Sequence, residues 1–163
     1  MPTHHTFRLL HRRRVHGQAQ LTCAVKVPTQ LPAWVRQAVA AAWPAIPAFT
    51  ATSWQLSIKV SGAAAAAAAN QQFRGKDYTP DVLSFPLWDD GYAGDILLCW
   101  PKLQADAAAQ GKPLPAHVQH LVVHALLHLA GEDHLTPAQA RRMEAQEIAI
   151  LHRLGWPNPY LIG

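Results

Sequence analysis

Two stretches of the chain alternate apolar and polar residues, and this period of two predicts half-buried β-strands at residues 20–27 and 53–60. Residues 81–86 are expected to form a third, short strand. Residues 95–100 form a nearly continuous apolar run, which is typical of a strand that is covered on both faces. A turn that includes the Asp-Asp-Gly sequence is expected between the last two strands, at residues 87–94.

Five segments are expected to be helical: residues 32–42, 63 to about 73, 101 to 111, 115–130 and 137–154. The second is alanine-rich, and alanine has the highest intrinsic helix propensity. Ser61 is expected to cap it, and Thr136 with Gln139 forms a capping box at the start of the last helix. In that last helix the residues expected to face the core are Met143, Ile148 and Leu151.

Strands and helices are intermixed along the chain, and the sequence contains no glycine-rich phosphate loop and no internal repeat. We therefore expect an α+β fold, in which a small mixed sheet of about four strands packs with about five helices. Helix 115–130 is expected to lie at the centre. At 163 residues the chain is expected to form a single domain, residues 1–163.

Composition bears on the partner and the compartment. The formal net charge is +4, with ten histidines besides, and this balance suits an acidic partner such as nucleic acid. The cluster Arg12-Arg13-Arg14 either binds phosphate or forms a solvated turn. Cys23 and Cys99 are the only cysteines, and we expect them to be reduced core residues of a cytoplasmic protein. The sequence shows neither a signal peptide nor an apolar run long enough to cross a membrane.

The strongest chemical signal lies at the end of helix 115–130, where His124 and His128 are four residues apart. On a helix such residues lie one turn apart on the same face, close enough to bind one ion. Gly131 easily adopts the left-handed conformation that ends a helix, so His134 can fold back toward the pair. Three imidazoles with an open fourth position are typical of a catalytic zinc ion rather than a structural one.

Two more histidines precede this motif. His120 would lie about 12 Å from His128 along the helix axis, whereas zinc-bound nitrogens lie about 2.1 Å from the metal. We therefore interpret His117 and His120 as neighbours of the site. The spacing of the motif is that of metzincin proteases, but Ala125 stands where those carry a glutamate general base. Peptide hydrolysis by that route is disfavoured, and metal-activated water is the expected nucleophile.

The segment from His124 to His134 resembles the signature of the YbeY family, bacterial rRNA-maturation metalloproteins assigned as endoribonucleases. Further landmarks of that family follow in order over roughly residues 54–160: Asn70-x-x-Phe73-Arg74, Lys76-Asp77, Asp81 to Pro86, Gly94-Asp95-Ile96, and Met143 with Glu147. The chain departs from the family pattern at Ala125, which replaces a glycine, at Glu132, which replaces a tyrosine, and at Thr79-Pro80, which inverts Pro-Thr. These departures bear on rate and substrate preference more than on the fold.

The resemblance implies a compact α+β domain that binds one zinc ion through His124, His128 and His134, with Arg74 facing the metal cleft. The implied function is a zinc-dependent, single-strand-specific endoribonuclease that acts in rRNA processing, including 16S 3′-end maturation, and in ribosome quality control. Its partners would be single-stranded rRNA and the ribosome. Two other classes stay open: a metal-dependent hydrolase of an amide bond, and a non-catalytic ribosome assembly factor.

Phosphodiester cleavage needs an activated water and a group that stabilises charge on the phosphoryl oxygens. Zinc supplies the water. Arg74 is the candidate for the second role, because a guanidinium matches a phosphate and stays charged; its alternative role is a surface salt bridge to Asp77 or Asp81. Asp133 is expected to hold a ligand imidazole by its second N–H. No side chain is an obvious general base.

Three aromatic residues flank the same region of the sequence. Phe85 and Trp100 are expected in the core, and only Trp88 is kept as a candidate for stacking on RNA bases. The spacing of Met143 is likewise that of a core residue rather than of a metzincin Met-turn.

Overall fold

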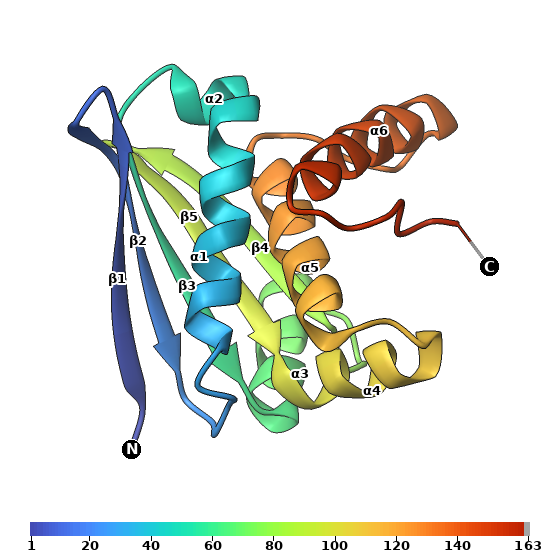
Figure 1. Cartoon of the computed structure of the whole chain (residues 1–163). Helices are drawn as coiled ribbons and strands as arrows, with labels where there is room; N and C mark the ends of the chain where they lie inside the picture. Colours follow the sequence, from blue (N-terminus) through green and yellow to red (C-terminus); the bar gives the residue numbers. More distant parts are fainter. Residues whose placement is uncertain (162–163) are drawn as a thin grey trace.

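The computed structural model describes residues 1–161 and contains one five-stranded sheet with helices on both faces (Figure 1). The elements in chain order are β1 (Thr3–His11), β2 (Arg14–Cys23), α1 (Leu31–Ala42), the 3-10 helix η1 (Trp43–Ala45), α2 (Pro47–Thr50), β3 (Trp54–Ser61), α3 (Ala63–Arg74), β4 (Val82–Asp89), β5 (Tyr92–Cys99), α4 (Trp100–Gln110), α5 (Leu114–Leu129) and α6 (Pro137–Arg153). The expected α+β class is confirmed. Within the described residues the sheet has one strand, and the chain one α-helix, more than expected.

The strand order is β1-β2-β3-β5-β4. The two outer pairs are antiparallel and the two inner pairs are parallel, so the sheet is mixed, as expected. One face of the sheet packs against α1 and α5, and α6 packs on the outer side of α5 (Figure 1). The alternation predicted for β3 is observed, because its buried residues include Trp54, Leu56, Ile58 and Val60. α5 therefore lies between the sheet and α6, with the core on one side.

The strand missed by the sequence pattern is β1, which pairs with β2 along the edge of the sheet. Only Phe7 and Leu9 of β1 are buried, and its other residues are polar or exposed. An edge strand that is covered on one face needs few apolar residues, so its periodic signal is weak. The strand expected at residues 20–27 instead spans Arg14–Cys23, because pairing with β1 extends it toward the N-terminus.

Most of the turn expected at residues 87–94 is strand. β4 continues to Asp89 and β5 begins at Tyr92, so only residues 90 and 91 connect them. The Asp-Asp-Gly sequence at residues 89–91 marks the turn correctly, but the turn is shorter than expected because the flanking residues pair as strand up to Asp89 and from Tyr92. Two smaller expectations are also wrong. Gly62 rather than Ser61 is the N-cap of α3, and in α6 the buried isoleucine is Ile150, since Ile148 is only half-buried.

The turn between β1 and β2 consists of Arg12 and Arg13, whose φ angles are 51° and 66°. A left-handed backbone costs a residue with a side chain roughly 1–2 kcal/mol. The cluster Arg12-Arg13-Arg14 thus lies at an exposed, conformationally costly turn.

The structure bears on two further expectations, one about the cysteines and one about membrane-spanning helices. Cys23 and Cys99 are both buried and free, as expected. No helix within residues 1–161 combines the length and the apolar character that crossing a membrane requires.

Candidate metal centre

The end of α5 is built as its sequence predicts. Gly131 has a φ of 95°, and its N–H donates to the carbonyl of His128 at 3.0 Å. The N–H of Glu132 donates to the carbonyl of Leu127, also at 3.0 Å. This pair of bonds is the Schellman motif, which satisfies the last carbonyls of a helix and reverses the chain. The reversal brings residues 132–134 back beside the last turn of α5.

The reversal places three imidazoles together. His124, His128 and His134 each offer one ring nitrogen, and these three nitrogens lie within 4.8 Å of one another. The Nε2 atoms of His124 and His128 are 3.1 Å apart. Two nitrogens that each lie about 2.1 Å from a tetrahedral zinc ion are separated by about 3.4 Å. The three histidines could therefore hold a metal ion; that they are its ligands remains a prediction.

The surroundings of His128 keep its imidazole in the neutral form that can bind a metal ion. Burial, followed by the nearby His124 and His134, lowers the pKa of His128 from 6.5 to about 4. The imidazole is therefore neutral at pH 7, with a free lone pair. His134 is exposed, so the site opens to solvent on that side.

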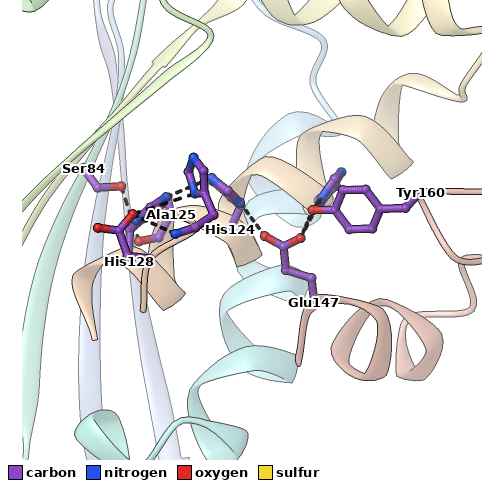
Figure 2. A network of polar contacts seen from close by, with 9 residues as sticks. Ser84, His124, Ala125, His128, Glu147 and Tyr160 are labelled. Carbon is purple, nitrogen blue, oxygen red and sulfur yellow. Dashed lines mark hydrogen bonds and ion pairs between the residues drawn. The ribbon is translucent and has the colours of Figure 1, made fainter. Parts of the chain in front are cut away.

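A fully buried carboxylate supports the site from α6. Glu147 accepts a hydrogen bond from Nδ1 of His124, and its other oxygen accepts from His120 at 3.2 Å and from the hydroxyl of Tyr160 (Figure 2). A carboxylate only accepts, so the proton of His124 lies on Nδ1. The lone pair of His124 is then on Nε2, on the side of the other two histidines.

The protonation states of this cluster follow from its contacts. Burial alone would raise the pKa of Glu147, but the hydrogen bonds from His120, His124 and Tyr160 lower it from 4.5 to about 2. Burial and the neighbouring carboxylate raise the pKa of Tyr160, so its hydroxyl stays protonated and donates. Glu147 is thus an anion that orients His124.

Glu147 takes the role that the sequence suggested for Asp133. Asp133 accepts the backbone N–H of His134 at 2.8 Å, but its oxygen lies 4.0 Å from Nδ1 of that ring, too far for a hydrogen bond. The expectation that Asp133 holds a ligand imidazole is therefore wrong. The available signal was an acidic residue on the buried face of α6, four residues from both Met143 and Leu151.

The interpretation of the other two histidines of α5 is supported. His120 contacts Glu147 and Tyr160, and it does not belong to the group of three. His117 is buried, and neither of its ring nitrogens has a hydrogen-bond partner among the described residues. Ala125, where metzincins carry the glutamate, is fully buried, and its carbonyl accepts a hydrogen bond from Ser84 of β4 at 3.3 Å (Figure 2).

Arg74 is the last residue of α3, and its side chain is exposed. Within residues 1–161 it forms no ion pair with Asp77 or Asp81, and Asp81 instead accepts the N–H of Val82 at 2.7 Å. The preceding residue, Phe73, packs edge-on against Phe85 of β4 with ring centroids 5.5 Å apart. The end of α3 and the part of α5 that carries His124 and His128 thus pack on the same edge strand, β4.

The division of the aromatic residues into core residues and a candidate for base stacking differs from the one expected from the sequence. Trp88, the candidate for base stacking, donates its indole N–H to the carbonyl of Leu129 at 2.6 Å and packs against Phe49. It therefore has a structural role in holding the end of α5. Trp100 is buried, as expected, but Phe85 is only half-buried. Met143 is a core residue, as expected.

Comparison with known proteins gives a consistent result. Residues 19–155 match the family model described as Endoribonuclease YbeY. The protein of that name from Aromatoleum aromaticum is 45% identical over 108 residues, which cover 65% of this chain and 70% of the relative. That from Ralstonia nicotianae is 43% identical over 151 residues, covering 89% of this chain and 75% of the relative. The solution structure of TM1509 from Thermotoga maritima has a TM-score of 0.55 at 19% identity and covers 88% of this chain and 99% of that one, which shows a shared fold.

Proposed function

The chain belongs to the YbeY family, and from that membership we propose that it is a metal-dependent endoribonuclease of rRNA processing. In detail, the proposed activity is zinc-dependent cleavage of single-stranded RNA, including maturation of the 16S 3′ end and ribosome quality control. The proposed partners are rRNA and the ribosome in the cytoplasm, and no association with a membrane is proposed. The observation that carries the proposal is the meeting of three histidine nitrogens within 4.8 Å beside a buried carboxylate.

The donor set suits zinc, because three neutral imidazoles leave one tetrahedral position for water or substrate. A bound zinc ion supplies a nucleophilic water at neutral pH. The residues of the chain orient the ligands and leave access for the substrate. Glu147 fixes the tautomer and orientation of His124 through Nδ1. The open side of the site at His134 admits the substrate.

We assign Arg74 to the phosphoryl oxygens of the substrate. Its support is that α3 ends on the strand against which α5 packs, and that the guanidinium has no ion-pair partner among residues 1–161. A guanidinium donates two parallel hydrogen bonds to a phosphate, and it stays charged at any relevant pH.

The activity itself is tested on a labelled RNA in single-stranded form and in duplex form, with EDTA and after zinc is restored. We expect the single strand to be cut, EDTA to stop the cleavage, and zinc to restore it, with the duplex and denatured casein left intact. Casein hydrolysis without RNA cleavage would instead favour an amide hydrolase. A His128→Ala protein that restores rRNA maturation in cells would favour a non-catalytic assembly factor.

The Arg74→Ala variant is expected to keep its bound zinc and to lose about 10²–10³-fold in the rate of RNA cleavage, the typical effect of removing one charge-stabilising group. Zinc content by atomic emission and cleavage rate at saturating RNA are the measurements. Lys76→Ala is the matched control, since Lys76 is also exposed and lies two residues away. Unchanged cleavage by Arg74→Ala would remove Arg74 from the mechanism.

A further inference from the structure

The tip of the β1–β2 hairpin carries arginine where the backbone disfavours it. Arg12 and Arg13 are the two central residues of the turn, and both have positive φ. Such two-residue turns strongly prefer Asn-Gly, because side chains are disfavoured in this region. An unfavourable residue at a surface turn indicates a role other than turn formation.

The positive charge of this hairpin has no acidic residue near it in sequence and no ion-pair partner among the described residues. Residues 1–76 hold nine of the fourteen lysines and arginines and none of the ten acidic residues. Arg8, Arg12, Arg13 and Arg14 are all exposed, and none forms an ion pair within residues 1–161. We call these four residues the hairpin patch. The patch also precedes residues 19–155, the part of the chain that the family model matches.

The hairpin tip and the metal-bearing end of α5 lie at the same end of the sheet (Figure 1). A row of contacts joins them across that end. His16 of β2 bonds to the carbonyl of Phe49 at 2.7 Å, and Phe49 packs on Trp88 with ring centroids 5.1 Å apart. Trp88 donates to the carbonyl of Leu129, the residue after His128. Four spacings of about 4.8 Å separate β1 from β4, the strand beside the end of α5. The distance across the sheet is therefore roughly 19 Å, which several nucleotides of single-stranded RNA can span.

Acidic residues limit the path that an RNA could take between the hairpin patch and the metal centre. Asp89 and Asp90 lie where β4 meets β5, and Asp90 lines a cavity of about 210 Å³ together with Val15 and His16. The short helix α2, Pro47–Thr50, carries no charged residue and holds Phe49 of the connecting row. A phosphate chain that avoids the two carboxylates therefore passes over α2.

From these observations, and resting on the proposed function, we propose that the hairpin patch is a second RNA-binding surface. It binds backbone phosphates of the same RNA molecule whose scissile bond lies at the metal centre. Arginine binds phosphate through paired, charge-assisted hydrogen bonds, without reading sequence. RNA fits better than an anionic membrane, because the substrate proposed for the metal centre at this same end of the sheet is itself a polyanion.

The test is a hairpin double variant that combines Arg12→Asn with Arg13→Gly, two residues that suit the turn and remove two charges. We expect the Tm to rise by about 2–4 °C while binding to a 30-nucleotide single-stranded RNA weakens. Loss of counterion release at two phosphate contacts predicts about a 25-fold rise in Kd at 0.1 M salt. The negative slope of log K against log salt should decrease in magnitude by about 1.4. Cleavage of a dinucleotide, whose only internucleotide phosphate is the scissile one and which cannot reach the hairpin patch, should not change.

Arg36→Gln combined with Arg153→Gln is the control, because it removes two exposed charges elsewhere; its Kd should change less than threefold. Parent-like binding of the long RNA by the hairpin double variant overturns the proposal, as does an equal loss in the control. Loss of binding to phosphatidylserine vesicles with unchanged RNA binding also overturns it, and identifies a membrane site. Failure of the parent to cut either RNA counts against the endoribonuclease function instead, since the binding comparison does not depend on cleavage.

Discussion

His128→Ala is expected to remove metal-induced stabilisation and RNA cleavage together. His128 lies between the other two histidines in the chain, and its Nε2 is 3.1 Å from that of His124. Without it, two imidazoles remain, and one of them is exposed. A ligand at one hundred times its Kd stabilises a protein by about 2.7 kcal/mol, and for a chain of this size 1 kcal/mol raises the Tm by about 2–4 °C. The parent should therefore gain about 5–10 °C in zinc, and the variant nothing.

Differential scanning calorimetry with and without zinc gives the first readout, and cleavage of single-stranded RNA gives the second. His152→Ala is the matched control, because His152 is exposed on α6 and lies outside the group of three; it should behave as the parent. A His128→Ala protein that still gains stability in zinc and still cuts RNA would show that the three histidines are not the metal site.

The part of this site that the sequence predicts is the part that depends on local geometry. The interval between His124 and His128 fixes their separation on a helix, and glycine at 131 fixes where that helix ends. Both follow from residues within one turn of each other. The grouping with His134 was therefore predictable before any tertiary contact was known.

The roles that the sequence did not predict depend on distant contacts, and they include that of Glu147, which the sequence marked only as a family landmark. Glu147 reaches His124 only because α6 packs back on α5, and Tyr160 reaches Glu147 from beyond the end of α6. Local spacing pointed instead to Asp133, which is adjacent to His134 in sequence but bonds its backbone. β1 was missed for a related reason: an edge strand depends on its partner, and its own sequence has little apolar periodicity.

Glu147→Gln is expected to weaken zinc binding about 10–100-fold, the usual effect of removing a group that orients a metal ligand. The amide keeps the size of the side chain and one acceptor oxygen, but it removes the charge opposite Nδ1 of His124. Competition with a chromophoric chelator measures the affinity. Glu144→Gln is the matched control on the same helix, since Glu144 forms no hydrogen bond or ion pair with the three histidines among the described residues.

The same variant carries a pH signature that a general loss of packing would lack. The pKa of Glu147 is about 2 in the folded protein against an ordinary value of 4.5, so folding favours its ionised form. Its contribution to stability is complete above pH 4.5 and is lost as the pH falls from 4.5 to 2. In the metal-free proteins, the difference in unfolding free energy between parent and Glu147→Gln should therefore shrink over that range. A constant difference instead, together with unchanged zinc affinity, would mean that the buried carboxylate neither orients His124 nor supports the metal centre.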